Sequence, residues 1–179
     1  MEKQQIKIAF YKGDPGRLHR FIRWWTKSKY SHAELVMPDG ETWWSISPFL
    51  NSDVSPRHRP AVDHPDRWDY LIFDLNWRKP VREYQLAQLH KFIDETRGHR
   101  YDWIGMLLSQ CTPFLIKRRD KWYCSEWIAH ALVNSRIVMW DNLKIYDTPD
   151  MSPGKLYDVL LETKLCKEAK FCESATYNL

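Results

Sequence analysis

The sequence predicts a single α+β domain, because strand-like segments come early in the chain and helical segments come later and between them. At 179 residues, the chain has the usual size of one domain and is long enough for a substantial core. Hydrophobic residues at 44% and charged residues at 28% are ordinary for a globular protein. Aromatic residues reach 15% and include 10 tryptophans, which favours a compact domain with aromatic-walled clefts. No internal repeat divides residues 1–179.

The start of the chain predicts a strand followed by an amphipathic helix. Residues 6–11 form a short, mostly apolar run typical of a strand. The run ends before Asp14, which can cap a helix, and Pro15, which suits the first helical position. The predicted core stripe of this helix consists of Leu18, Phe21, Ile22 and Trp25. The basic residues that fall largely off this stripe are Arg17, Arg20, Arg23 and Lys27. We expect these to form a solvated face, with an anion-binding face as the alternative.

Residues 31–36 and 41–46 predict a β-hairpin, because two strand-like runs are joined by a turn that contains Asp-Gly. In a strand, His32 and Glu34 point to the same face, since side chains alternate with a period of two. A carboxylate beside an imidazole raises its basicity and can fix its tautomer. A simple surface pair is the alternative interpretation of these two residues.

The middle of the chain predicts one irregular segment, one strand and two helices. Residues 47–67 contain four prolines, so we expect a long irregular active-site loop there. Residues 68–75 predict another strand, residues 81–97 a helix ended by Gly98, and residues 102–111 a short apolar helix. The inward side chains of the longer helix are predicted to be Leu86, Leu89, Phe92 and Ile93. Near the end, Ser152-Pro153 predicts the start of a last helix through Leu161, and residues 165–172 predict an edge strand.

Cys124 begins another amphipathic helix. The apolar positions that follow it, at helical spacing, are Trp127, Ile128, Ala131 and Leu132. The cysteine therefore lies in the first turn, where unpaired backbone N–H groups and the positive end of the helix dipole favour an anion. A thiol placed there ionises more easily, and the thiolate is the nucleophilic form. A buried core cysteine is the alternative.

Cysteine spacing, apolar runs and net charge indicate which cofactors, compartment and partners to expect. The four cysteines, Cys111, Cys124, Cys166 and Cys172, show neither a CxxC pair nor a Cys/His cluster at zinc spacing. We therefore expect no zinc site, and because a thiolate nucleophile requires neither a metal nor an organic cofactor, we expect none. The polar start of the chain has no signal-peptide core, and no apolar run approaches the length of a membrane span, so we expect a cytoplasmic protein with free thiols. The net charge of +4 is mild and no nucleic-acid motif is present, so we do not expect nucleic acid as a partner. Contact with a membrane surface is compatible with this positive charge.

Two motifs resemble the circularly permuted branch of the NlpC superfamily. They are Ser31-His32-Ala33-Glu34-Leu35-Val36 followed by Asp39-Gly40, and Tyr123-Cys124-Ser125-Glu126. This branch is papain-like, with the histidine strand before the cysteine helix, and includes YiiX-like proteins of bacteria and phages and, more distantly, lecithin retinol acyltransferase. The resemblance covers roughly residues 6–46 and 85–160. It implies a permuted papain-like fold with an antiparallel sheet packed against the Cys124 helix, and a phage-encoded protein in a bacterial host.

The resemblance also suggests roles for residues outside the two motifs. Unpermuted cell-wall peptidases of the superfamily carry a G-x-x-Y segment before the cysteine, which Gly98-His99-Arg100-Tyr101 resembles. This implies that Tyr101 lies near the oxyanion site, and a core anchor is an equal alternative. Family members often place a polar residue where this chain has Trp44, which cannot accept a hydrogen bond from an imidazole. The orienting residue is then Glu34, Glu41 or Ser45, or the site is a Cys-His dyad, and we favour Glu34.

Together these residues predict a cysteine hydrolase, peptidase-like or amidase-like, that cleaves an amide, ester or thioester through an acyl-enzyme. The predicted catalytic residues are Cys124 as nucleophile, His32 as general base and Glu34 as its partner. The predicted substrate-binding residues are Tyr101, Tyr123 and Ser45. The expected substrate is a small peptide, an amide or an acyl lipid. Two alternatives stay open: a lipid acyltransferase or hydrolase of the lecithin retinol acyltransferase type, and a non-catalytic binding module that keeps the fold.

Overall fold

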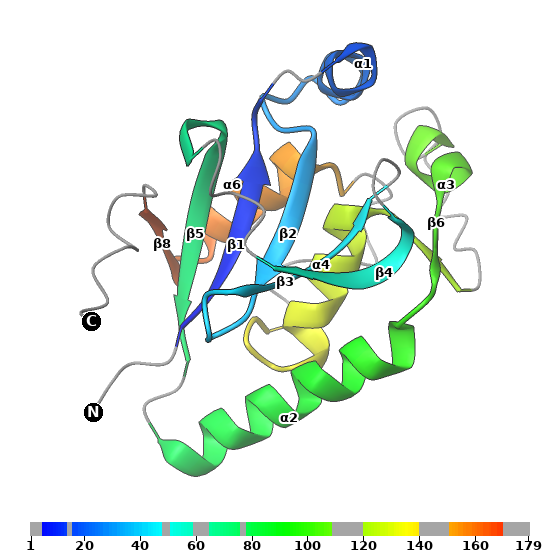
Figure 1. The fold of residues 1–179 in the computed structure, drawn as a ribbon. Helices are drawn as coiled ribbons and strands as arrows, with labels where there is room; N and C mark the ends of the chain where they lie inside the picture. The colour runs from blue at the N-terminus through cyan, green and yellow to red at the C-terminus, as the bar shows by residue number, and fades with distance from the viewer. Residues whose placement is uncertain are drawn as a thin grey trace.

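A curled eight-stranded sheet with helices packed on one of its faces forms the fold of this protein (Figure 1). The computed structural model describes residues 5–13, 16–47, 51–58, 65–75, 78–108, 120–139 and 151–169. The strands are β1 (Gln5–Tyr11), β2 (His32–Val36), β3 (Thr42–Ser47), β4 (Asn51–His58), β5 (Trp68–Asp74), β6 (Arg100–Tyr101), β7 (Lys121–Trp122) and β8 (Cys166–Ala169). The helices are α1 (Arg17–Trp25), α2 (Lys79–Thr96), α3 (Trp103–Leu108), α4 (Cys124–Asn134) and α6 (Pro153–Glu162), with a 3-10 turn at Pro65–Arg67.

The strand order is β7-β6-β4-β3-β2-β1-β5-β8, and all neighbours are antiparallel except β6 and β7. The hairpin predicted from residues 31–46 is confirmed as β2 and β3, with Leu35 opposite Trp44. The predicted strands at the start of the chain and at residues 68–75 are confirmed as β1 and β5. The predicted edge strand near the C-terminus is β8, which pairs with β5.

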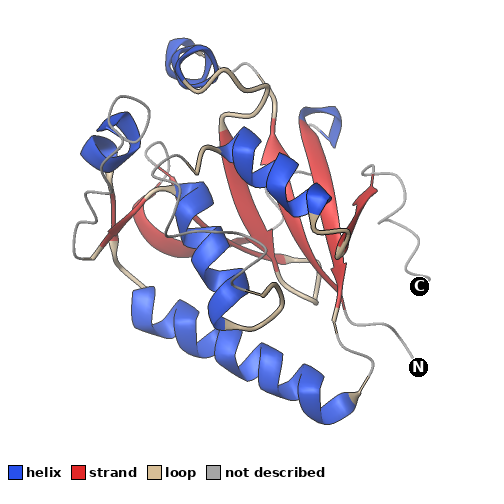
Figure 2. Ribbon diagram, turned by 180° about the vertical axis from the view of Figure 1, so that it is seen from behind, coloured by secondary structure: helices blue, strands red, loops and turns tan. Residues whose placement is uncertain are grey.

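The two faces of the sheet bury different sets of side chains. The main core lies under α4 and α6, which cover one face, and α2 packs against α4 (Figure 2). Its largest fully buried members include Trp127, Phe10, Phe73, Leu35 and Ile128. The opposite face carries a smaller cluster of Ala9, Val36, Trp43, Trp68 and Tyr70. Because side chains alternate along β2, Leu35 faces the main core while Glu34 and Val36 face the smaller cluster.

The prediction of an irregular segment over residues 47–67 is wrong for residues 51–58, which form β4. Pro56 lies in this strand opposite Trp44. Proline is tolerated in a sheet mainly on an edge, and the described pairing of β4 with its other neighbour β6 joins Asp53 and Arg100, away from Pro56. Beside Pro56 the strand is therefore close to an edge, and the missing N–H costs little. Residues 48–50 and 59–64 lie outside the described residues.

Helix α1 lies beyond the ends of the strands rather than on a face of the sheet (Figure 1). It begins after Gly16, and the predicted capping residues 14 and 15 lie outside the described residues. Of the predicted core stripe, Ile22 is buried, but Phe21 is 39% exposed, so that part of the prediction is wrong. A helix that meets only the strand ends buries a narrow stripe, and Phe21 falls outside it.

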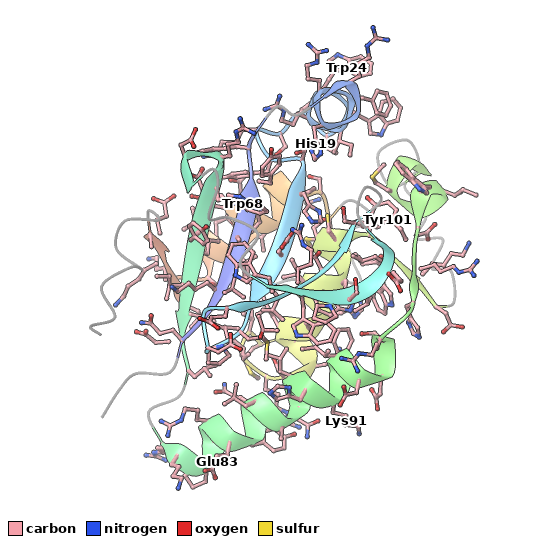
Figure 3. The ribbon with its side chains drawn as sticks, in the orientation of Figure 1. His19, Trp24, Trp68, Glu83, Lys91 and Tyr101 are labelled. Atoms are coloured by element: carbon pink, nitrogen blue, oxygen red, sulfur yellow. The ribbon has the colours of Figure 1, made fainter. Side chains whose placement is uncertain are left out.

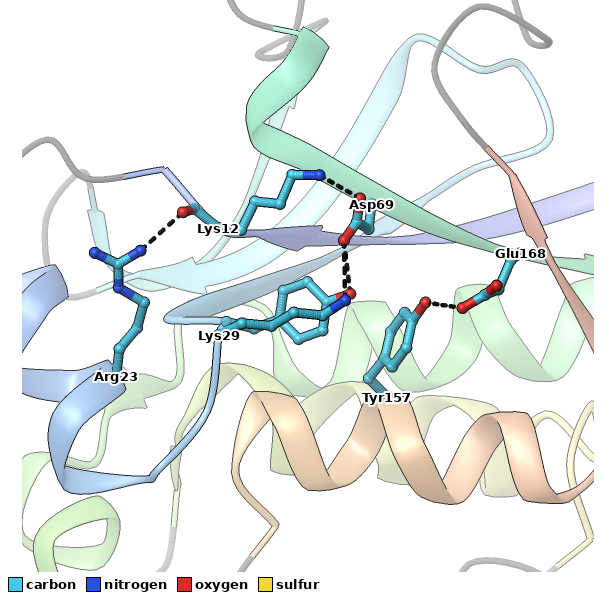
Figure 4. Close-up of polar contacts among 7 residues, drawn as sticks. Lys12, Arg23, Lys29, Asp69, Tyr157 and Glu168 are labelled. Carbon is cyan, nitrogen blue, oxygen red and sulfur yellow. Dashed lines mark hydrogen bonds and ion pairs between the residues drawn. The ribbon is translucent and has the colours of Figure 1, made fainter.

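A polar cluster ties both flanks of α1 to the sheet (Figure 4). Asp69 of β5 accepts hydrogen bonds from Lys12 Nζ at 2.6 Å, just before α1, and from the Tyr30 hydroxyl at 2.8 Å, just after it. Lys29 Nζ lies 3.4 Å from the same carboxylate. Arg23 of α1 itself donates to the Lys12 carbonyl at 2.9 Å. These contacts hold α1 in one orientation on the body of the protein.

The predicted ends of the other helices are confirmed where they are described. Gly98 follows α2 with φ of +79°, the left-handed conformation that favours glycine at a helix end. The Ser152 hydroxyl accepts a hydrogen bond from the Lys155 backbone N–H at 3.3 Å and so caps α6. The short helix predicted over residues 102–111 is α3, with residues 109–111 outside the described part. Within the described ranges, no helix combines the length and the hydropathy that crossing a membrane requires.

Candidate active site

Cys124 is the first residue of α4 and is only 4% exposed. Tyr123 precedes it in an extended conformation, with φ of −108° and ψ of 160°, so the helix starts abruptly at the cysteine. Burial by itself raises the pKa of the thiol. The His32 side chain and hydrogen bonds from the backbone N–H groups of Ala33 and Ser125 outweigh burial and lower the pKa of Cys124 from its ordinary value. The cysteine is thus both buried and activated.

His32 is the first residue of β2, and its ring lies between Cys124 and Glu34. Its Nε2 lies 3.1 Å from Glu34 Oε1. Its other nitrogen, Nδ1, is the one that remains for the hydrogen bond to the Cys124 side chain. Burial by itself lowers the pKa of His32, but the thiolate of Cys124 and the carboxylate of Glu34 outweigh it and raise that pKa to about 9. At neutral pH the geometry therefore favours a thiolate and an imidazolium.

The packing of α4 on the hairpin brings these residues together. Helix α4 lies against β2 and β3, so the first turn of the helix meets the first residues of β2. The contact between the Ala33 backbone and the thiol fixes this register. Period two in β2 then places Glu34 on the same side as His32. Because the His32 ring contacts Cys124 on one side and Glu34 on the other, the predicted nucleophile and the predicted pair form one row.

Arg57 of β4 extends this row and was missed by the sequence analysis. Its Nη2 donates to Glu34 Oε1, the same oxygen that faces His32. The Glu34 side chain is fully buried, and that of Arg57 is 22% exposed. A buried carboxylate needs a partner of opposite charge, and Arg57 supplies it. The sequence did not predict this residue, because Pro56 makes its segment look like a loop. The one signal for it was the acidic residue on the predicted strand β2, since a buried acidic side chain needs a basic partner.

Tyr70 of β5 also lies toward the buried carboxylate. Burial, and to a lesser degree the charge of Glu34, raise the pKa of its hydroxyl. Tyr70 belongs to the smaller hydrophobic cluster, which shares its side of the sheet with Glu34. This cluster shields the carboxylate from solvent on the face that no described helix covers.

Tyr101 of β6 is buried close to the thiol. Its hydroxyl donates to Met106 Sδ of α3 at 3.0 Å. Burial, followed by the negative charge of the Cys124 thiolate, raises the pKa of Tyr101 well above its ordinary value. The Tyr101 hydroxyl therefore keeps its proton and remains a hydrogen-bond donor near the Cys124 thiolate. The geometry fits both alternatives in the sequence analysis, since Tyr101 is anchored in the core and also faces the nucleophile.

A small cavity lies over Cys124. Tyr101, Tyr123 and Ser125 line it together with Met106 of α3, Ile22 of α1 and Thr26, which directly follows α1. Two of the predicted substrate-binding residues, Tyr101 and Tyr123, are thus brought to the nucleophile. The third, Ser45, is buried on β3 opposite Ser55 and is not among the described residues that line the cavity.

The structure distinguishes the residues considered as partners of the imidazole. Trp44 belongs to the main core, on the face of the sheet opposite to Glu34. Glu41 is exposed in the turn after β2, at the far end of that strand from His32. No hydrogen bond between Ser45 and His32 is found among the described residues. Glu34 is the acidic residue that contacts the ring.

Comparisons with known proteins give one similar fold. No protein-family model matches the chain, and no curated protein matches it. The crystal structure of the metalloprotein yiiX from Escherichia coli O157:H7 is similar, with a TM-score of 0.54, 18% identity, and coverage of 95% of this chain and 98% of that one. Across the described part of this chain, no group of three or more His, Cys, Asp or Glu side chains is arranged to hold a metal ion, so these residues do not fit a metal site. The chain therefore shares the α+β fold of yiiX over nearly the whole length of both proteins, in agreement with the YiiX-like motifs.

Proposed function

We propose that this protein is a cysteine hydrolase of the circularly permuted papain-like (NlpC-type) class that cleaves an amide, ester or thioester. The observation that carries the proposal is the row of Cys124, His32 and Glu34, in which a helix-start thiol contacts an imidazole and a carboxylate lies 3.1 Å from the other side of the ring. Such a row supplies a nucleophile, a proton carrier and an orienting group. The histidine strand precedes the cysteine helix, and the similarity to yiiX supports the fold.

In the first half of the proposed reaction, the Cys124 thiolate attacks the carbonyl carbon of the substrate. A carbon–sulfur bond forms, and the π electrons of the carbonyl move to its oxygen. The backbone N–H of Cys124, at the positive end of α4, can donate to this oxyanion. The Tyr101 hydroxyl can add a second donor, because its present acceptor, the Met106 sulfur, is a weak one and is given up at little cost.

Collapse of this intermediate breaks the bond to the leaving group, which takes the Nδ1 proton of His32. The neutral His32 then removes a proton from the water that attacks the acyl-enzyme. The second collapse releases the acid and restores the thiolate and the imidazolium. Glu34 stabilises the imidazolium at Nε2 in both halves, and Arg57 holds Glu34 in place.

The two alternatives differ from this proposal in testable ways. A lipid acyltransferase would use the same residues and pass the acyl group to an acceptor other than water. The alternative of a binding module rests on Trp44, which cannot accept a hydrogen bond from an imidazole. The contact of Glu34 with His32 supports a catalytic site, since it provides the orienting partner that Trp44 does not.

The test is the pH dependence of iodoacetamide alkylation at Cys124, read by peptide mass spectrometry. An unperturbed thiol has a pKa of about 8.5. Because His32 lowers the pKa of Cys124, alkylation should already be fast at neutral pH and rise little toward alkaline pH. Cys166 is an internal control, because burial raises the pKa of its thiol to about 11 and it should react slowly at the same pH.

Variants then assign the cause of the reactivity. His32→Ala should move the alkylation profile of Cys124 to higher pH, and Glu34→Gln should move it by a smaller amount, since His32 then loses the carboxylate that raises its pKa. Glu41→Gln is the matched control and should leave the profile unchanged, because Glu41 is exposed and lies at the other end of β2. A Cys124 that reacts no faster than Cys166, or that is indifferent to His32→Ala, would remove the basis of the proposal.

A further inference from the structure

Exposed apolar side chains gather at the end of the molecule where the cavity lies. The large apolar side chains that are exposed among the described residues are Phe21, Trp24, Val81, Tyr84, Trp103, Ile104, Met139 and Leu165. Half of these belong to α1 and α3, which lie at the same end of the molecule (Figures 1 and 2). The same two helices contribute Ile22 and Met106 to the cavity over Cys124. Helices α1 and α3 therefore both carry exposed apolar side chains and contribute to the lining of that cavity.

Helix α1 carries the most exposed of these side chains. Trp24 is 71% exposed and lies on the outer side of α1, whereas His19 lies on the side toward the sheet (Figure 3). The rings of Phe21 and Trp25 stack with their centroids 5.9 Å apart, and the ring centroid of Trp24 lies 6.1 Å from each of them. These rings contact one another but leave Trp24 uncovered. Isolated exposed apolar residues are normal, but an exposed aromatic cluster marks an interaction surface.

The charge of this segment has one sign. Residues 16–31 contain Arg17, Arg20, Arg23, Lys27 and Lys29 and no acidic residue. Arg17 and Arg20 are exposed, and at 100° per residue both lie beside Trp24 on the outer face of the helix. Aromatic and cationic side chains therefore alternate around that face. An anionic surface with an apolar layer beneath its charges complements both kinds of side chain.

The helix is already held in place before it meets a partner. His19 Nδ1 lies 2.8 Å from the Ser31 hydroxyl, and Arg23 donates to the Lys12 carbonyl. The cluster around Asp69 ties down the segments on both sides of α1 (Figure 4). Docking would therefore cost little ordering entropy.

We propose that α1, with α3 beside it, is the surface by which this protein docks on an anionic lipid membrane. Helices that lie in the membrane interface combine aromatic side chains at the headgroup level with Lys and Arg that contact lipid phosphates. A second copy of this surface would bring like charges together, which argues against self-association through α1. The surface and its test do not depend on whether Cys124 is catalytic.

The test is co-sedimentation of the full chain with vesicles of phosphatidylcholine and phosphatidylglycerol in equal amounts, compared with vesicles of phosphatidylcholine alone. We expect binding to the anionic vesicles that weakens as salt is added. Trp24→Ala should weaken binding about tenfold, through the lost apolar area. Arg17→Glu should weaken it by about tenfold or more, through the change of two charges near the surface. An acidic residue in the first turn also favours the helix, so this variant keeps α1 folded.

Tyr84→Ala and Lys91→Glu on α2 are the matched controls, because both side chains are exposed and lie on another helix. Both variants should bind as the wild type does. Equal binding to neutral vesicles, no binding at all, or binding that is indifferent to Trp24→Ala and Arg17→Glu would each overturn the proposal. Self-association that Trp24→Ala abolishes, without vesicle binding, would overturn it in favour of a second copy of the chain. Alkylation of Cys124 in solution should be unchanged in Trp24→Ala, which separates this result from a failure of the hydrolase proposal.

Discussion

At the scale of single residues, the site is a buried row of alternating charges. The Cys124 thiolate, the His32 imidazolium, the Glu34 carboxylate and the Arg57 guanidinium follow one another, each in contact with the next. This alternation explains how Glu34 can be fully buried while charged. It also explains why His32 keeps its proton despite burial. The loss of one member should therefore be felt by its neighbours.

Arg57→Gln should lower the free energy of unfolding by about 2–3 kcal/mol, because it leaves the Glu34 carboxylate buried without its cation. The partial exposure of Arg57 places the expected loss below the roughly 3–5 kcal/mol of fully buried ion pairs. Urea unfolding monitored by circular dichroism measures it. The double variant Glu34→Gln/Arg57→Gln should recover part of the loss, since the buried charge is then gone. Strictly additive losses would contradict a direct ion pair.

Turnover should also depend on pH through His32. Its pKa is raised to about 9, so the imidazolium that protonates the leaving group is present below that pH and is lost as the pH rises through it. Once a substrate is found, its hydrolysis should therefore fall above pH of about 9, while alkylation of Cys124, which needs no leaving-group proton, should not. A parallel fall of both rates would point to unfolding rather than to titration of His32.

At the scale of elements, short-range signals set most boundaries. The Asp-Gly turn fixes the β2–β3 hairpin, Ser152 caps α6, and Gly98 ends α2 in a left-handed conformation. These devices keep β2 and α4 in the positions that the site needs. The end of α2 offers a direct measurement of one of them.

Gly98→Ala should lower the free energy of unfolding by about 1 kcal/mol, because a Cβ is disfavoured at positive φ. A Cβ built at this position meets no atom, so the cost is conformational rather than steric. Gly16→Ala is the matched control: that position is equally open, and its φ of 163° is extended backbone that any residue adopts. Equal losses in the two variants, measured by urea unfolding, would contradict this explanation.

At the scale of the whole molecule, the strands near the centre of the sheet are buried on both faces. Strand β1 lies between β2 and β5 and contributes Ile8 to the main core and Ala9 to the smaller cluster on the other face. Helices α1 and α3 lie at one end and expose large apolar side chains. The centre and the docking end should therefore differ in stability.

Hydrogen exchange followed by mass spectrometry should show this difference. Amides of β1 should exchange slowly, because they are paired on both sides in a strand buried on both faces, and amides of α3 should exchange much faster. Anionic vesicles should slow the exchange of α1 and α3 and leave β1 unchanged. Exchange of α3 as slow as that of β1 without lipid would contradict this picture.

The sequence by itself determined the elements with strong local patterns. Apolar periodicity predicted β1, β5, α2 and α4, and turn or cap residues predicted the hairpin and α6. It also placed Cys124 at a helix start and His32 and Glu34 on one strand face, because both relations depend on the period of a single element. Their catalytic roles, and the substrate-binding roles of Tyr101, Tyr123 and Ser45, stay predictions.

Only the tertiary structure decided which elements meet. In the structure, the first turn of α4 lies against the start of β2, and part of the proline-containing segment forms strand β4. Arg57 of that strand contacts the buried Glu34. The structure also showed that Phe21 is exposed, because α1 packs beyond the strand ends. These features depend on contacts between residues far apart in the chain. Local periodicity shows which side of an element is apolar. Whether that side is covered, and by which element, depends on how the whole chain packs.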